Sequence, residues 1–101
     1  SDYVFEPDYA LKPLQEVDQF IQQNKHLPDI PSAQEFKENG VGLGEMDDML
    51  LRKVEELTLY VIELKKADDH KSKVIEELKE ENQLLKTDIL KEIETIKAQL
   101  K

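Results

Sequence analysis

The stretch LLRKVEELTLYVIELKKADDHKSKVIEELKEENQLLKTDI, residues 50–89, decides the fold of this chain. Apolar side chains recur in it at alternating intervals of four and three residues, which places them in one row along a helix. Nine of the twelve positions in the row are aliphatic, so we predict a coiled coil between copies of the chain. This row, called the seam below, consists of Leu50, Val54, Leu57, Val61, Leu64, Asp68, Lys71, Ile75, Leu78, Asn82, Leu85 and Ile89.

Polar residues interrupt the seam in two places. Asp68 and Lys71 lie in a polar patch, which fits either a looser part of one helix or a break between two helices. Neither Gly nor Pro occurs after Gly44, so we expect one continuous helix over residues 45–101. Asn82 either fixes the register of the helices or is a single tolerated polar residue. Beyond Ile89 the apolar spacing changes, which predicts a local unwinding of the supercoil.

A second set of apolar residues lies on the same predicted helix but outside the seam. A helix that is apolar on two sides must be covered on both, and residues 3–43 are the apolar material available. We therefore expect a small N-terminal domain, residues 1–44, to pack on residues 46–64. The predicted docking residues are Leu51, Leu59, Tyr60 and Ile62 on the helix, and Phe5, Val17, Phe20 and Ile21 in the N-terminal domain.

The N-terminal domain is predicted to contain one short strand and two helices. Residues 3–5, Tyr-Val-Phe, have the composition of a strand. Residues 13–24 carry one apolar face and begin with a proline, which suits the first position of a helix. A proline-rich segment, residues 26–31, cannot be helical, because each proline pushes the residue before it into an extended conformation; it is expected to be an ordered crossing segment or a loop. Residues 33–39 follow a capping-box pattern and form the second helix.

The ends of these elements are marked by particular residues. Ser32 and Glu35 have the spacing of the capping box. Gly40 can take the left-handed conformation that ends a helix, and residues 41–44 are expected to be a glycine-containing link. The predicted fold is mainly α: a small helical domain with one short strand, packed on a long parallel coiled-coil helix that spans residues 45–101.

Composition argues against several classes of function. The chain has 101 residues, no cysteine and a formal net charge of −9. A nucleic-acid partner normally requires a basic patch, and no 18-residue apolar run is present to enter a membrane. The absence of cysteine excludes disulfides and thiolate metal sites. Neither a nucleic-acid partner nor membrane insertion is therefore expected.

No catalytic or cofactor-binding pattern is found in the sequence. His26 and His70 are far apart, and His26 lies beside prolines in an expected loop. Asp68, Asp69 and His70 are consecutive, so they do not share one face of a helix and form a poor metal site. No phosphate-binding loop, nucleophile elbow or zinc motif occurs. We therefore expect no enzyme activity, no cofactor and no metal.

Five short runs carry a resemblance to a known family. They are DYVFEPDY at 2–9, LQEV at 14–17, HLPDIPS at 26–32, GLGEM at 42–46 and VEELTLY at 54–60. In this order and spacing, they resemble the C-terminal region of tail-fibre-domain proteins of Bacteroidetes bacteria. The resemblance covers roughly residues 2–66, and it extends to the intramolecular chaperone domains that end phage tail spikes.

The resemblance implies a cap on an exported or phage-derived fibre, located at the cell surface or on a virion. It implies a trimer that aligns three chains so that the fibre region upstream in the same chain can fold. Some chaperones of this kind cleave themselves at a serine junction, but no such junction is found here. The strand-like beginning of the chain suggests a fragment of a longer protein.

The oligomer number and the function each have an alternative. Val or Ile alternating with Leu in the seam, with one Asn, favours a parallel dimer, whereas the resemblance favours a trimer. We predict a parallel homotrimer, with a dimer as the alternative. An alternative function is the binding of a receptor or glycan by a domain displayed on the coiled-coil stalk, for which Tyr3, Tyr9 and Tyr60 are candidates.

Overall fold

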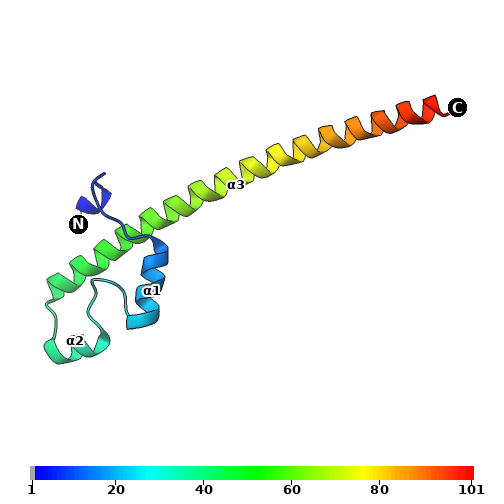
Figure 1. Cartoon of the computed structure of the whole chain (residues 1–101). Coiled ribbons are helices and arrows are strands. Elements are labelled where there is room, and N and C mark those ends of the chain that lie inside the picture. Colours follow the sequence, from blue (N-terminus) through cyan, green and yellow to red (C-terminus); the bar gives the residue numbers. More distant parts are fainter. Residues whose placement is uncertain (1) are drawn as a thin grey trace. The chain divides into compact units, whose positions relative to one another are not determined.

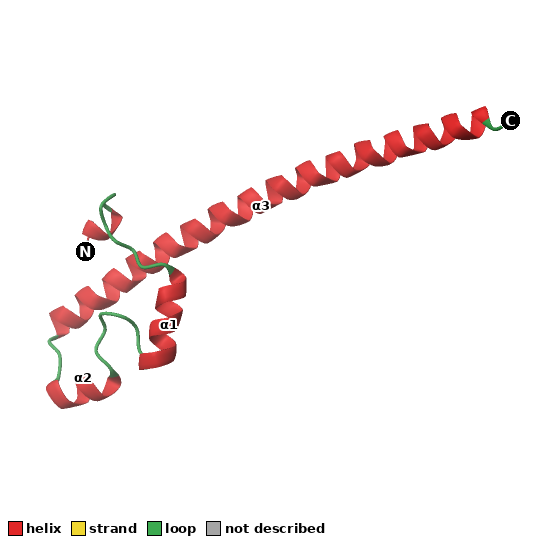
Figure 2. Ribbon diagram, in the orientation of Figure 1, coloured by secondary structure: helices red, strands yellow, loops and turns green. Residues whose placement is uncertain are grey.

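The computed structural model describes residues 2–101 and is mainly helical, as predicted. The helices, in chain order, are η1 (Asp2–Phe5), α1 (Leu14–Asn24), α2 (Ala33–Asn39) and α3 (Leu43–Gln99) (Figure 1). Loops connect them, and the described residues contain no strand (Figure 2). The chain divides into two compact units, Ser1–Glu63 and Leu64–Lys101.

The predicted strand at residues 3–5 is wrong. These residues lie in η1, a 3₁₀ helix, and the Glu6 N–H donates a hydrogen bond to the Tyr3 carbonyl oxygen at 3.2 Å. A strand needs a neighbouring strand to pair its N–H and C=O groups. No second strand is present among residues 2–101. The segment therefore forms a backbone hydrogen bond within itself, in a tight turn. The turn buries Val4, which is 1% exposed.

Helix α1 begins one residue later than expected. Pro13 is its N-cap residue with an extended ψ of 141°, and its carbonyl oxygen accepts hydrogen bonds from the N–H groups of Glu16 and Val17. Proline has no N–H to leave unpaired at this end of a helix. The helix ends at Asn24, because Lys25 adopts the left-handed conformation with a φ of 60°.

Helix α2 has the predicted bounds and the predicted capping box. The Ser32 hydroxyl accepts a hydrogen bond from the Glu35 N–H, and the Glu35 carboxylate accepts one from the Ser32 N–H, both at 3.2 Å. The bond from the Ser32 backbone is the main reason that the pKa of Glu35 is lowered. Gly40 ends the helix with a φ of 65° and a ψ of 176°. Because this φ is positive, a side chain at Gly40 would strain the backbone.

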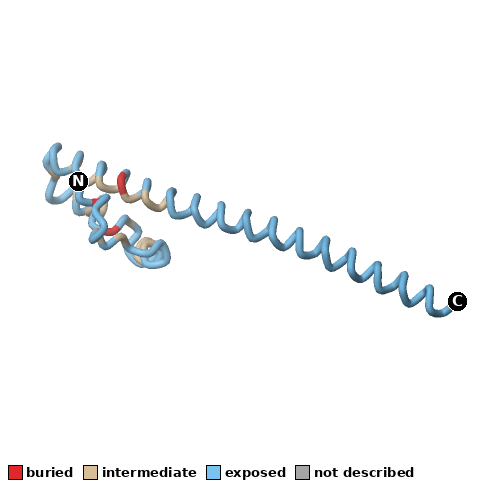
Figure 3. The backbone as a smooth tube through the Cα atoms, turned by 90° about the horizontal axis from the view of Figure 1, so that it is seen from above, coloured by how far each residue is buried: buried red, intermediate tan, exposed pale blue. Residues whose placement is uncertain are grey.

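Helix α3 begins at Leu43, so Gly44 lies in its first turn and not in a link as expected. It is one helix of 57 residues and continues without a break through residues 66–71, as predicted. The compact N-terminal unit extends to Glu63 and includes the beginning of α3. The expected domain boundary at residues 44/45 therefore differs from the unit boundary at 63/64. Burial along α3 is confined to the first unit (Figure 3).

Candidate oligomerisation surface

In the first unit, α3 has two distinct faces. At 3.6 residues per turn, its less exposed residues occupy about half of the helix circumference. We call this half the covered face; it consists of Met46, Met49, Arg52, Lys53, Glu55, Glu56, Leu59 and Tyr60. Exposed apolar residues occupy the other half. We call that half the free face; it carries Leu50, Leu51, Val54, Leu57, Val61 and Ile62.

Tyrosine hydroxyls tie residues 3–12 to the covered face. The Tyr60 hydroxyl donates to the Lys12 carbonyl oxygen at 2.6 Å, and the Tyr9 hydroxyl donates to Glu56 Oε2 at 2.5 Å. Tyr3 accepts a longer bond, of 3.4 Å, from the Arg52 guanidinium. Its ring lies 5.8 Å from that of Tyr9. These polar contacts therefore hold the segment before α1 against α3.

An ion-pair cluster joins the loop after α1 to the covered face. Lys53 Nζ lies 2.9 Å from a Glu56 carboxylate oxygen and 3.8 Å from an Asp29 carboxylate oxygen. The side chains of Lys53 and Glu56 are only 18% and 12% exposed, so salt screens this pair less than a surface pair. Asp29 has a positive φ of 64°. The contact between Lys53 and Asp29 places this turn of the loop beside the helix.

The docked position of the tyrosines changes their acidity. Burial, and then the hydrogen bond to Glu56, raises the pKa of Tyr9 to about 12. Burial also raises the pKa of Tyr60, and the nearby carboxylates of Glu56 and Glu63 act in the same direction. Both hydroxyls are donors in the folded chain, so the docked segment depends on their protonated form.

The predicted docking residues fall on different faces. Leu59 and Tyr60 lie on the covered face, and Val17, Phe20 and Ile21 of α1 are half-buried. Leu51 and Ile62, by contrast, are 54% and 44% exposed. They lie on the free face, where the N-terminal segments do not reach, so their assignment to docking within one chain is corrected. Phe5 is also exposed, because the turn of η1 directs Val4 inward in its place.

Sequence reasoning missed the polar residues that hold the N-terminal segments in place. Their partners are far apart in the chain: the Tyr9–Glu56 and Tyr60–Lys12 bonds span 47 and 48 residues. No local spacing predicts such pairs. The available signal was the tyrosines themselves, since a tyrosine ring packed on a helix normally finds a partner for its hydroxyl.

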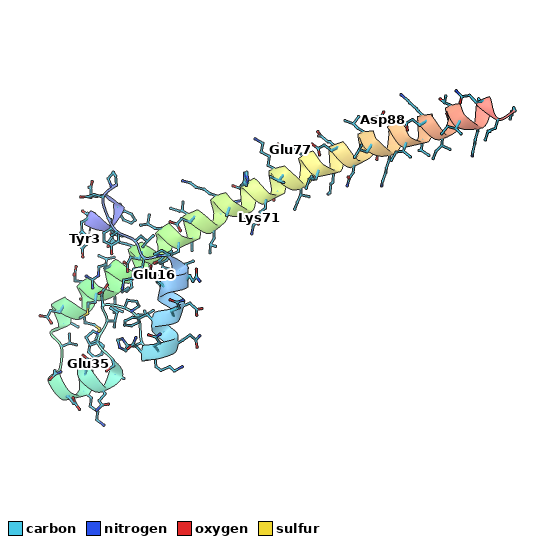
Figure 4. The ribbon with its side chains drawn as sticks, in the orientation of Figure 1. Tyr3, Glu16, Glu35, Lys71, Glu77 and Asp88 are labelled. Atoms are coloured by element: carbon cyan, nitrogen blue, oxygen red, sulfur yellow. The ribbon has the colours of Figure 1, made fainter. Side chains whose placement is uncertain are left out.

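The seam is uncovered in both units. Its aliphatic residues, which are Leu50, Val54, Leu57, Val61, Leu64, Ile75, Leu78, Leu85 and Ile89, are between 51% and 60% exposed. Asp68, Lys71 and Asn82 are exposed as well. In the second unit every residue is exposed, and side chains project from α3 on all sides (Figure 4). The predicted oligomer interface is therefore accessible to another molecule throughout its length.

A groove of about 580 Å³ lies beside the seam in the first unit. One wall is formed by the N-terminal segments and the other by α3, and both walls are largely apolar. We call it the α1 groove. Its apolar lining consists of Ala10, Leu14, Val17, Leu27 and Pro28 on one side and Leu50, Val54 and Leu57 on the other.

The two histidines are the remaining candidates for catalytic or metal-binding residues. His26 Nδ1 lies 2.9 Å from the Leu27 carbonyl oxygen, and its ring makes an edge contact with Phe20. His70 is exposed. Across residues 2–101, no three His, Cys, Asp or Glu side chains are grouped so that they could hold a metal ion. In the same part of the chain, no helix is long and apolar enough to cross a membrane.

Comparison of the chain with protein-family models, with curated proteins and with solved structures gave no match.

Proposed function

We propose that this chain is a non-enzymatic homo-oligomerisation module that aligns copies of a fibrous surface or phage tail-fibre-like protein. In this role it also nucleates the folding of the fibre region upstream in the same chain. The observation that carries the proposal is the seam, whose nine aliphatic residues stay more than half exposed in the single chain. A stripe of this kind on a long helix is stabilised by packing on other helices.

The width of the free face supports more than two strands. Leu51 and Ile62 lie beside the seam on one side and broaden the apolar stripe beyond the narrow seam of a two-stranded coiled coil. A helix in a trimer contacts two neighbours and so buries a wider stripe. We therefore keep the parallel homotrimer as the proposed assembly, with the dimer as the alternative.

Charge and topology support a parallel assembly that nucleates folding. In a parallel register, Glu81 of one helix faces Lys86 of the next, which is an attractive pair worth a few tenths of a kcal/mol. The N-terminal segments dock on the covered face and leave the seam free. Contacts within a helix are local and form quickly. Because the seam is left free, the helices of different copies can associate before any distant part of the fibre has folded.

The alternative function, binding of a receptor or glycan, has less support. Tyr3 is half exposed, but the hydroxyls of Tyr9 and Tyr60 are used inside the chain. A binding site normally offers its polar groups to the ligand. The exported or virion location remains part of the proposal and depends on the resemblance to tail-fibre-domain proteins.

Light scattering of the purified chain tests the proposal. The chain mass is 11.8 kDa, and we expect about 35 kDa, three times that value, for a closed trimer. A mass near 24 kDa would replace the trimer with a dimer. A mass of 11.8 kDa at all accessible concentrations would contradict the proposed function.

A further inference from the structure

We infer that the α1 groove of one copy receives the α3 helix of a neighbouring copy, whose Leu51 and Ile62 pack between α1 and the seam. This inference rests on the proposed parallel assembly. It assigns a second role to the N-terminal domain, which would form part of the interface between chains and not only a cover for its own helix.

The surface of the seam is continuous with that of the α1 groove. Leu50, Val54 and Leu57 belong to the seam and also line the α1 groove. A helix that packs on these three seam residues therefore also contacts the groove. Leu14 and Leu27, on the opposite wall, are more than two-fifths exposed in the single chain, so they have apolar surface left for such a helix.

The α1 groove and the pair Leu51 and Ile62 flank the seam on different sides of α3. The groove lies on the side of α3 that carries Lys53 and Tyr60, whereas Leu51 and Ile62 lie on the other side of the seam. In a parallel coiled coil these two flanks of adjacent helices face each other. Each groove therefore meets the Leu51 flank of the next copy, and this head-to-tail contact closes into a ring.

The charges that line the α1 groove limit the kind of occupant it can take. Three of its four charged side chains are paired within the chain: Lys53 with Glu56 and Asp29, and Glu56 also with the Tyr9 hydroxyl. The fourth, Lys12, has its ammonium over the Phe20 ring, 5.7 Å from the ring centroid. The groove therefore offers few unpaired charges and favours an apolar occupant. Leu51 and Ile62 supply one, since they are eleven residues apart and lie within about 20° of each other around the helix axis.

The internal contacts also fix which residues should meet. Asp29 contacts Lys53 and Lys12 contacts Tyr60, so Leu27 lies near the level of residue 53 and Leu14 near the level of residue 60. With neighbouring helices in register, Leu51 of one copy packs against Leu27 of the next. Ile62 then packs against Leu14, about 16 Å further along the axis.

Disulfide trapping tests this pairing, because the chain has no cysteine of its own. Chains with Leu27→Cys are mixed with chains that carry Leu51→Cys and a mass tag, and are refolded together and oxidised. Leu14→Cys with Ile62→Cys forms a second matched pair. Leu27→Cys with Ile62→Cys is the mismatched control, because its α-carbons are too far apart for a disulfide. Only a bridge between a tagged chain and an untagged chain gives the intermediate mass.

We expect the matched pairs to form at least about ten times more mixed disulfide than the mismatched pair. The masses of the reduced variants are measured first by light scattering. Where the first matched pair disturbs assembly, the second matched pair is used for the comparison. An oligomeric mass with no preference for the matched pairs would overturn the groove inference and leave the proposed function standing. A mass of 11.8 kDa for the unsubstituted chain would overturn both.

Discussion

Two parts of one helix, residues 43–63 and residues 64–99 of α3, differ in how their side chains are covered. In the first part, half of the circumference is covered by residues of the same chain. In the second part, every residue is exposed. Both parts carry the same seam. The comparison shows that covering by the chain itself is limited to the face opposite the seam, so neither part has its seam buried.

Because of this difference, substitutions on the covered face and substitutions in the seam should have different effects. Changes on the covered face should affect the docking of residues 2–42 and leave the second part of the helix intact. Changes in the seam should affect association and, through it, the stability of residues 64–99. An isolated helix of ordinary sequence is marginal in water.

The largest effect is expected from a charge in the seam of the second part. Leu85→Asp would place an unpaired carboxylate between helices in every copy, at a cost of about 3 kcal/mol or more per assembly. We expect the oligomer to dissociate at micromolar concentration, as measured by light scattering. Gln83→Asp, two residues away and off the seam, is the matched control and should leave the mass unchanged. Equal masses for both variants would argue against the seam.

The next effect is expected on the covered face. Leu59→Glu should loosen the N-terminal segments by about 2 kcal/mol, because it places a charge where residues 3–43 pack. Limited proteolysis of residues 6–13 and 25–32 should become faster, while residues 75–100 keep their helical signal. Leu59→Met preserves volume and should behave as the unsubstituted chain. Unchanged resistance of the loops in Leu59→Glu would show that this face does not hold them.

A smaller effect follows from the raised pKa of Tyr9. Its pKa is about 12 in the folded chain, above its ordinary value of 10, so the docked form binds the proton more tightly than the undocked form. The stabilisation is complete below pH 10 and is lost as the pH rises toward 12. Titration by tyrosinate absorbance should show one tyrosine ionising last, and Tyr9→Phe should remove that step. A late step that persists in Tyr9→Phe would assign it to another tyrosine.

The smallest effect is expected at the start of α2. Ser32→Ala removes the hydroxyl that caps the Glu35 N–H and should cost about 1 kcal/mol of local stability. Faster amide exchange over residues 33–39 would show the loss, and Ser32→Thr should retain most of the protection. The oligomer mass should not change in either variant, because α2 contributes no residue to the seam or to the α1 groove.

Periodic and capping patterns predicted much of this structure. The capping box of Ser32 and Glu35 and the helix through residues 66–71 both follow from local spacing and from the absence of Gly and Pro. The strand at residues 3–5 could not be excluded by composition, because whether it forms depends on a partner strand elsewhere. Long-range polar pairs such as Tyr9–Glu56 also leave no local pattern.

The apolar residues of α3 outside the seam were predicted to form one face, but they lie on two different sides of the helix. Counting apolar residues on α3 grouped Leu51 and Ile62 with Leu59 and Tyr60. The angle of each residue around the helix separates them, because one docked domain covers only about half of a helix. Exposure in the folded chain then shows which half is left for other copies.

The most direct test of the central claim is amide hydrogen exchange of residues 75–89 at a series of protein concentrations. If other copies cover the seam, protection of these amides should be high in concentrated solution and should fall on dilution as the oligomer dissociates. Fast exchange at every concentration, or protection that does not change while the mass stays at 11.8 kDa, would contradict the account.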